Sequence, residues 1–525
     1  MCLIAVRSVW VKYVSPDAIE GSHCCRVLRY GLPPHPILLH FIPHGGRFPT
    51  REAPMEPQAD LKFQDLQRPA ERLFELAARK VRTLDRSWDP TKGTPVFTVE
   101  GKYTTRGWTE WTQGFQYGCA ILAFDATGEK DLLELGRNNT LRFMAPHVTH
   151  TGVHDHGFNN ISTYGNLRRL MLEGRIPQNE WELNFYQLAL KASGAVQGAR
   201  WSGVPVAKPS SLSGNSSALG YVYSFNGPHS LFIDTMRTVR ILGVAWQLGH
   251  ALMHENDRRA DLLKRSVLHG LTTHQYLVFH GGSGHTYDLP GRTAHEGVFN
   301  RNDGNFRSRA TQQGYSPFST WTRGLAWAML GFAEELEFFE TIDDAAFQSS
   351  VGLPKRDVVA AYEQAARQTC DHYLEDCAAA DGIVYWDDGA PGLAKMPGWR
   401  GRPADPFNEF EPVDSSASAI AAQGLLRFGK YLGPKGERYT RAGLSVARVL
   451  FEEPYLSTRE DHQGLLLHSV YHRPNGWDYI PPGRKVPCGE SSMWGDYHAI
   501  ELALLIRRIA RGEGYYAFFD QPRTA

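Results

Sequence analysis

Helix-type spacing of apolar residues recurs along most of this chain, with short connections between segments. Apolar positions return at i, i+3, i+4 and i+7 in about twelve segments. Strand-like alternation is rare and short, as in residues 382–386. Helices in antiparallel pairs predict an all-α (α/α)6 barrel, with inner and outer helices and a site at one end. The predicted helical segments are 68–83, 108–126, 130–146, 158–174, 178–195, 231–254, 256–276, 319–338, 356–378, 414–431, 435–452 and 490–512.

The predicted barrel fills residues 55–525 as a single domain. Residues 1–54 are rich in proline and glycine after an interrupted apolar start. We therefore expect a poorly ordered extension, or sequence upstream of a natural start near Met55. No segment is long and apolar enough to span a membrane. Seven scattered cysteines favour free thiols and a cytoplasmic location, with the periplasm as the alternative if the start is misplaced.

Long irregular segments interrupt the helical pattern. Residues 200–222 are rich in Ser, Gly and Pro and are expected to form a loop. Residues 278–318 and 386–413 have too few aliphatic side chains for buried helices. Because long loops inside compact domains usually serve function, we expect residues 278–318 to form a wall of the binding pocket.

Several function classes are disfavoured by charge and motif content. The 56 basic and 56 acidic side chains balance, which argues against bulk attraction to nucleic acid or to an anionic membrane. His154-Asp155-His156, and His250 with His254 on one predicted helix face, could ligate a metal, but no H-E-x-x-H motif is present. We expect no metal and no cofactor. The sequence also contains no G-x-S-x-G elbow, P-loop or Rossmann fingerprint, and it leaves the oligomeric state open.

Two acidic residues stand among apolar and glycine neighbours. Asp155 lies in the run 152–158 and Asp234 in the run 232–236. Two such carboxylates facing one apolar pocket would form an acid/base pair suited to sugar chemistry. A single buried Asp is more often a helix cap or an ion-pair partner, so the catalytic interpretation depends on both residues facing one pocket.

Aromatic and polar side chains accompany this pair. Trp111 and Phe115 are four residues apart, and so are Arg323 and Trp327. Each pair therefore shares a helix face and could either pack in the core or face a sugar ring. Arg323 offers a planar fork that suits a carboxylate, and an ion pair within the barrel is its equally weighted alternative.

Six sequence blocks occur in one order between residues 108 and 502. They are Trp111-Thr112-Gln113-Gly114-Phe115, His154-Asp155-x-Gly157-Phe158, Ile233-Asp234-Thr235-Met236, Ser319-x-Trp321-x-Arg323-Gly324-x-Ala326-Trp327, Asp414-Ser415-Ser416-Ala417 with Ile420-Ala421-Ala422, and Trp494-Gly495-Asp496-Tyr497. Together they resemble glycoside hydrolase family 88, the unsaturated glucuronyl hydrolases. The resemblance also implies an (α/α)6 barrel.

The resemblance implies hydration of a double bond in place of attack at the anomeric carbon. The substrate is a lyase-generated oligosaccharide with a 4,5-unsaturated uronic acid at its non-reducing end. Asp234 would protonate C4 and activate the water that adds at C5, and Asp155 would position the substrate and tune Asp234. An acid for this step must stay protonated near neutral pH, and repulsion between two carboxylates in an apolar pocket raises one pKa. The implied substrate-binding residues are Trp111, Phe115, His154, His295, Gln313, Arg323 and Trp327.

Three positions depart from the family pattern: Leu325, Thr238 and Phe225 stand where Gln, Asn and Trp are usual. They leave the parent polysaccharide open among glycosaminoglycan, ulvan and bacterial exopolysaccharide fragments. The alternatives are a related (α/α)6 unsaturated rhamnogalacturonyl hydrolase and a carbohydrate-binding barrel without catalysis.

Overall fold

Twelve helical segments alternate between an outer and an inner position along the chain. The computed structural model describes residues 55–519 except 56, 59, 107–109 and 206–218, and these fall within one unit of the chain. The outer helices are α1 (Gln67–Ser87), α3 (Lys130–Phe143), α7 (Glu180–Ala199), α10 (Leu262–Tyr276), α13 (Lys355–His372) and α15 (Glu437–Leu450). The inner segments are α2 (Gln113–Thr127), α5 with α6 (His156–Asn160, Asn166–Leu172), α8 with α9 (Thr235–Thr238, Arg240–Gln247), α11 (Thr322–Glu340), α14 (Ser415–Leu432) and α16 (Met493–Arg511).

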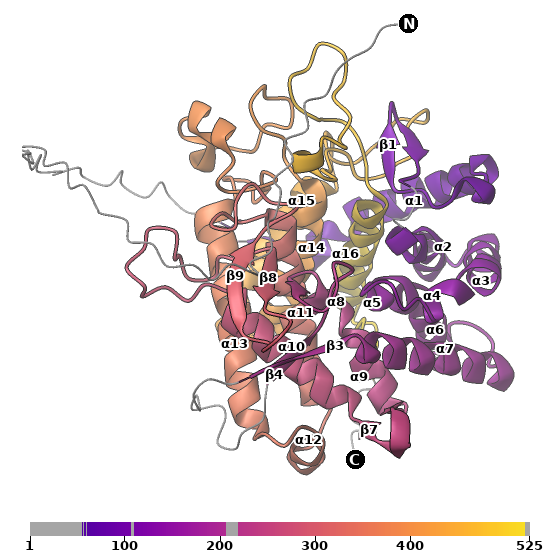
Figure 1. The fold of residues 1–525 in the computed structure, drawn as a ribbon. Helices are drawn as coiled ribbons and strands as arrows, with labels where there is room; N and C mark the ends of the chain where they lie inside the picture. Colours follow the sequence, from indigo (N-terminus) through magenta and orange to yellow (C-terminus); the bar gives the residue numbers. More distant parts are fainter. Residues whose placement is uncertain (1–54, 56, 59, 107–109, 206–218, 520–525) are drawn as a thin grey trace, which may run out of the picture. The chain divides into compact units, whose positions relative to one another are not determined.

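The inner segments close into a ring. Each packs on the next in chain order, from α2 through α5, α8, α11 and α14 to α16, and α16 returns to α2. The outer helices cover this ring, as α15 does on α14 and α13 on α11 (Figure 1). The predicted (α/α)6 barrel is thereby confirmed.

Burial distinguishes the two layers. Helix α11 is buried along nearly its whole length, because it contacts neighbours on every side. Helix α1 buries one stripe that includes Leu73, Phe74 and Ala77 and exposes the opposite charged face. The amphipathic pattern therefore marks the outer helices, and a nearly continuous apolar pattern marks the inner ones.

Short strands occupy segments that the sequence predicted to be irregular. Strand β5 (Ser230–Phe232) pairs with β8 (Glu296–Phe299), and β8 pairs with β9 (Phe306–Ala310), so the prediction of a wholly irregular segment at 278–318 is wrong. Strands β3 (Trp201–Val204) and β4 (Leu219–Val222) form a hairpin within the predicted loop 200–222. The remaining strands are β1 (Phe97–Val99), β2 (Lys102–Thr104), β6 (Leu252–Met253) and β7 (Arg259–Ala260).

The largest boundary error concerns the predicted helix at 231–254. The chain there begins as β5, turns at Asp234, forms α8 and α9 and ends its helix at Gln247. Asp414 caps α14, accepting hydrogen bonds from the backbone N–H groups of Ser416 and Ala417. Helix α11 begins after Trp321 without a side-chain cap.

Smaller features complete the described chain. Helices α4 (Ala145–Val148) and α12 (Asp344–Val351) lie between the main segments, and a π-helical turn at Ile161–Gly165 joins α5 to α6. The helices of the described chain include none with the length and apolarity needed to cross a bilayer. The predicted extension at residues 1–54 lies outside the described residues.

Candidate active site

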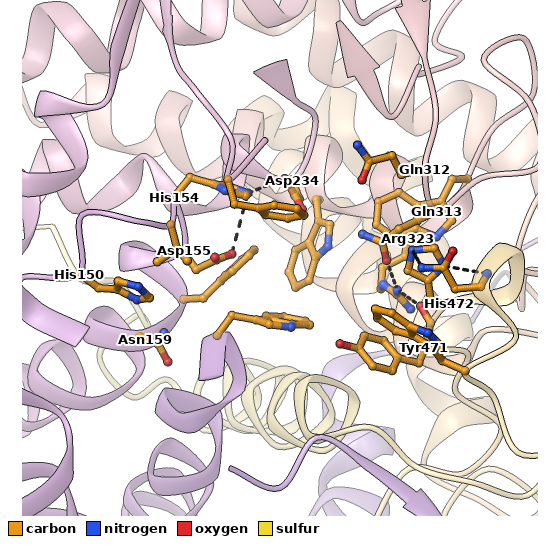
Figure 2. A pocket seen from close by; sticks show the side chains of 18 of the residues that line it. His150, His154, Asp155, Asn159, Asp234, Gln312, Gln313, Arg323, Tyr471 and His472 are labelled. Carbon is orange, nitrogen blue, oxygen red and sulfur yellow. Dashed lines mark hydrogen bonds and ion pairs between the residues drawn. The ribbon is translucent and has the colours of Figure 1, made fainter. Parts of the chain in front are cut away.

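A pocket opens at the N-terminal ends of several inner helices, and its empty space, including the solvent at its mouth, is about 940 Å³. Figure 2 shows His154, Asp155 and Asp234 on one side of it, and Gln313, Arg323, Tyr471 and His472 on the other. The lining residues are Trp111, His147, His150, Val153, His154, Asp155, Phe158, Asn159, Phe225, Asp234, Gln312, Gln313, Trp321, Arg323, Trp327, Tyr471, His472, Asn475 and Trp477.

Asp155 immediately precedes α5, and close backbone packing fixes its place. A Cβ atom on Gly157 would lie 2.1 Å from the backbone oxygen of Thr238, so only glycine lets α5 approach α8 this closely. Thr238 also donates a hydrogen bond from its hydroxyl to the His154 carbonyl over 2.8 Å. The segments that carry Asp155 and Asp234 are therefore held together by a close backbone contact and a hydrogen bond from the Thr238 side chain.

Asp234 stands at the junction between strand β5 and helix α8. The N–H of the preceding Ile233 donates to the His295 carbonyl over 3.0 Å, which continues the β5–β8 pairing to the edge of the pocket. The side chain of Asp234 then leaves the strand and enters the pocket (Figure 2).

His154 connects the two carboxylates. Its Nε2 atom lies 3.3 Å from Asp234 Oδ1 and 3.9 Å from Asp155 Oδ1, and its side chain is 1% exposed. The ring also lies against Phe225 and Phe232. One imidazole can therefore donate to Asp234 while it holds positive charge beside both acids.

The surroundings of the two carboxyl groups shift their pKa values in opposite directions. Burial raises the pKa of Asp155, and the charge of Asp234 adds to that increase. Burial would also raise the pKa of Asp234, but the charge and hydrogen bond of His154 lower it below the ordinary value. Burial alone would lower the pKa of His154, and the two carboxylates raise it. The proton of the pair is therefore favoured on Asp155, whereas the resemblance pointed to Asp234 as the acid.

An aromatic surface lines the same pocket as His154 and the two carboxyl groups. The Trp111 ring stacks on Trp494 with centroids 4.9 Å apart, and Trp327 packs on Phe158 at 4.7 Å. Trp111 and Trp327 line the pocket. Phe115 is fully buried behind Trp111 and does not belong to the lining, so it supports the surface without forming it.

Arg323 lines the pocket, but its guanidinium is bound within the protein. One terminal nitrogen donates to Asp414 Oδ2 at 3.1 Å and to the Val470 carbonyl. The other donates to Gln313 Oε1 at 3.0 Å and to the Tyr471 carbonyl at 2.7 Å. These contacts match the ion-pair alternative for this residue, and they orient Gln313.

His295 lies behind the lining. Its Nδ1 accepts a hydrogen bond from the Gln312 N–H at 2.9 Å, and its ring packs on Phe232 and Trp321. Burial lowers the pKa of His295 to about 4, so the ring is neutral near pH 7. The structure thus places His295 as a support for Gln312, a lining residue that the sequence did not single out.

The sequence reasoning missed the segment 471–477. Tyr471, His472, Asn475 and Trp477 line the pocket opposite the acid pair. The rings of His472 and Trp477 lie 4.8 Å apart. Polar and aromatic residues adjoin glycine and proline in this stretch, which is the one signal that could have indicated it.

Neither histidine pattern that could have ligated a metal is assembled. His156 directs one ring nitrogen to Ser193 Oγ and the other to the His150 carbonyl, each at 2.9 Å, so it does not join His154 in the pocket. Helix α9 ends at Gln247, so His250 and His254 do not share a helix face and that interpretation is wrong.

Sequence comparisons find relatives along most of the chain, although no family model matches it. The unsaturated glucuronyl hydrolase of Bacillus sp. (strain GL1) is 27% identical over 250 residues, which are 47% of this chain and 52% of that protein. The unsaturated chondroitin disaccharide hydrolase of Streptococcus pyogenes serotype M1 is 23% identical over 440 residues, 82% of this chain and 89% of that protein. The chain thus spans about half the length of the Bacillus relative in that alignment.

Solved structures share the fold. The unsaturated glucuronyl hydrolase from Bacillus sp. GL1 superposes with a TM-score of 0.61 at 22% identity and covers 87% of this chain and 100% of its own. The unsaturated glucuronyl hydrolase from Streptococcus agalactiae superposes with a TM-score of 0.58 at 20% identity and covers 90% of this chain.

Proposed function

Because this chain belongs to the unsaturated glucuronyl hydrolases of glycoside hydrolase family 88, we propose that it removes a 4,5-unsaturated uronic acid from the non-reducing end of lyase-generated oligosaccharides. The observation that carries the proposal is the placement of Asp155 and Asp234 around His154 in one aromatic-lined pocket. The substrate class follows the relatives, whose names specify unsaturated glucuronyl and chondroitin disaccharide substrates.

The reaction adds water across the C4=C5 bond. A proton reaches C4, the positive charge that develops at C5 is eased by the neighbouring carboxylate, and a water oxygen bonds to C5 while its proton returns to the acid/base. Asp234 is proposed as that acid/base. The resulting hemiketal opens and releases the remaining sugar with a free hydroxyl. Protons balance, because the one given to C4 is replaced by the one taken from water.

Substrate binding offers a physical route to a protonated Asp234. The substrate's uronate carboxylate would bring a further negative charge into the pocket, and a like charge raises the pKa of a neighbouring carboxyl. His154 would meanwhile keep Asp155 and Asp234 oriented by its position between them. The acid would thus be protonated when C4 lies beside it.

Two features of the pocket supply positive charge that suits an anionic substrate. Helices α2 and α11 both begin at the pocket, and helix N-termini favour negative charge. Arg323 adds its charge while its N–H groups stay bound to the protein. Because Gln313 Oε1 accepts from Arg323, its amide NH₂ group is proposed as a donor to a substrate oxygen. Trp111 and Trp327 would supply stacking surfaces.

Loss of ultraviolet absorbance from the conjugated uronate tests the proposal. We would mix the purified protein with unsaturated disaccharides from chondroitin, heparin, hyaluronan, ulvan and gellan. A decay on at least one substrate with wild-type protein, and none with D234N, is expected. Absence of decay on the whole panel, together with measurable binding, would favour the non-catalytic barrel.

A reducing compartment is part of the proposal. Four cysteines among the described residues, Cys119, Cys370, Cys377 and Cys488, form no disulfide. Unpaired buried thiols are typical of proteins kept in the cytoplasm. Labelling of the native protein's thiols after rapid lysis would show whether they are reduced in the cell.

A further inference from the structure

A compact cluster of metal-ligand side chains lies outside the pocket lining. His372 at the end of α13, Cys377 five residues later and Asp388 in the following loop bring one ligand atom each within 4.8 Å of the others. The side chains of His372 and Asp388 are 0% and 3% exposed, and Cys377 is buried. A nitrogen, a sulfur and a carboxylate oxygen in one buried cluster form a donor set that suits zinc.

An uncommon backbone turn creates this arrangement. Residues Tyr373–Cys377 form a π-helical turn, closed by a hydrogen bond from the Ala378 N–H to the Tyr373 carbonyl at 2.9 Å. This wider turn brings residues five apart onto one side, so the side chains of His372 and Cys377 face the same point. Such turns inside or at the end of α-helices frequently mark functional sites.

The distances are close to those of a tetrahedral zinc site. Donors bound to one zinc ion lie roughly 3.3–3.6 Å apart, given bonds of about 2.0–2.3 Å. His372 Nε2 lies 3.4 Å from Asp388 Oδ2, and Cys377 Sγ lies 4.0 Å from the same oxygen. All three ligand atoms lie within 4.8 Å of one another, so side-chain rotations that shorten these separations would complete the site. From this geometry we propose that His372, Cys377 and Asp388 bind a structural zinc ion.

A neighbouring carboxylate completes the pattern expected around a ligating histidine. Asp376 Oδ2 lies 3.1 Å from His372 Nδ1, so this nitrogen carries the proton and Nε2 is left to face the metal position. Thr320 Oγ1 lies 2.9 Å from Nε2 and would give up this hydrogen bond to the metal, and a water would supply the fourth ligand. Charge also balances: the two carboxylates and a Cys377 thiolate face a divalent ion and Arg292, which lies 2.9 Å from Asp388.

The site would fix the wall of the pocket. Asp388 Oδ1 accepts from the Thr320 N–H at 2.6 Å, just before α11, and Arg292 links Asp388 to the Phe318 carbonyl. Asp387 accepts from the Tyr315 N–H at 2.8 Å. The segment that carries Gln312 and Gln313 is therefore anchored to this cluster. A metal bound here acts by positioning that segment, and it takes no part in the hydration chemistry.

Protonation of His372 could stabilise the same cluster without a metal. A protonated His372 between Asp376 and Asp388, with a neutral Cys377 thiol, would also be electrically balanced. The two readings differ in one measurable respect, which is the presence of a tightly bound ion that depends on the Cys377 thiolate. The sequence analysis expects no metal, because a histidine and a cysteine five residues apart match no common zinc motif.

Metal content of untagged protein tests the proposal. We expect about one zinc ion per chain by mass spectrometry of protein purified without chelator, and its loss in C377S. C370S is the matched control, because Cys370 is a buried thiol in α13 two residues before His372, and D234N controls for the pocket. Both controls should keep the ion. Zinc retained by C377S, or lost from D234N, would overturn the proposal.

A second measurement avoids dependence on the variant's folding. Wild-type protein exchanged with Co²⁺ should show thiolate-to-cobalt charge-transfer absorption, because Cys377 would be a ligand. Removal of the ion by a strong chelator should lower the melting temperature. Wild-type protein that binds neither ion after equilibration with Zn²⁺ or Co²⁺ and desalting would refute the site.

Discussion

His154 Nε2 lies 3.3 Å from Asp234 Oδ1 and 3.9 Å from Asp155 Oδ1, so one buried imidazole contacts the buried carboxyl group of Asp155 and the half-buried one of Asp234. This geometry lowers the pKa of Asp234, while burial leaves that of Asp155 raised. Neighbouring carboxyl groups with opposite shifts can take different roles in one reaction. The roles of the two groups can therefore be separated by experiment.

Replacement of Asp234 by Asn should remove the acid/base and lower kcat by about a thousandfold. Binding of the unsaturated disaccharide, measured by calorimetry, should change little because the side chain keeps its size. Asp155→Asn serves as the comparison and should retain more activity, since a positioning role tolerates a neutral side chain better. Activity of D234N within about tenfold of wild type would show that another group donates the proton.

The His154–Asp234 pair should give the protein a pH-dependent stability. Because the folded-state pKa of His154 is raised, its contribution is complete below the ordinary value of 6.5 and is lost as the pH rises through the folded value. Because the pKa of Asp234 is lowered, its contribution is present above 3.8 and is lost as the pH falls through the folded value. Melting curves of H154Q should therefore differ most from wild type between these limits. An equal difference at alkaline pH would contradict the assignment.

Arg323→Ala should destabilise the barrel strongly. The variant would leave the buried Asp414 carboxylate without its guanidinium partner, at a cost of about 3–5 kcal/mol. Urea unfolding measures the free energy, and D414N completes a double-mutant cycle. Arg356→Ala is the control, because the Arg356 side chain is 87% exposed and its pair with Asp357 should contribute little. A loss of stability no larger than that of the control would return Arg323 to a role in substrate binding alone.

Trp111→Ala should raise KM with a smaller effect on kcat. Removal of the stacking surface costs roughly 1 kcal/mol, or severalfold in KM. Trp111→Phe should recover most of the loss, because it retains an aromatic face. Steady-state kinetics on the best disaccharide separate the two parameters. A fall in kcat at unchanged KM would instead place Trp111 in the chemical step.

Gly157→Ala should reduce both stability and activity. The added methyl group would lie 2.1 Å from the Thr238 carbonyl oxygen and would push α5 away from α8, thereby separating the two acids. Gly401→Ala is the control, because a Cβ there meets nothing within 4 Å. We would compare melting temperature and kcat for both variants. A fully active G157A would mean that the spacing of α5 and α8 is not critical.

The barrel could be predicted because the spacing of apolar residues within each segment is enough to identify its helices. Periodicity located every main helical segment, since outer helices bury one stripe and inner helices are apolar nearly throughout. The segment 231–254 was misread because its apolar run continues from β5 through α9, and composition does not separate a buried strand from a buried helix. The strands at 296–299 and 306–310 depend on pairing with β5, a long-range contact that no local pattern reports.

In the candidate site, too, local features could be predicted from the sequence and long-range contacts could not. Asp155 and Asp234 were found because an acidic residue among apolar neighbours stands out in the sequence. The role of Arg323 depends on Asp414 and on the carbonyls of Val470 and Tyr471, which are distant in the chain. The sequence predicts substrate contacts for Phe115 and His295, but both residues are buried behind the pocket lining. Helix periodicity tells which residues share a face but not how deep that face lies.

Two kinds of segment form the pocket: the starts of packed helices and a loop between helices. The acids stand at the starts of α5 and α8, locked by the contact of Gly157 with Thr238, whereas His472, Asn475 and Trp477 belong to a connection between helices. Loops tolerate replacement far better than packed helix junctions. A lineage, or an engineer, could therefore exchange the loop wall to accept a different leaving sugar while inheriting the proton-transfer apparatus unchanged.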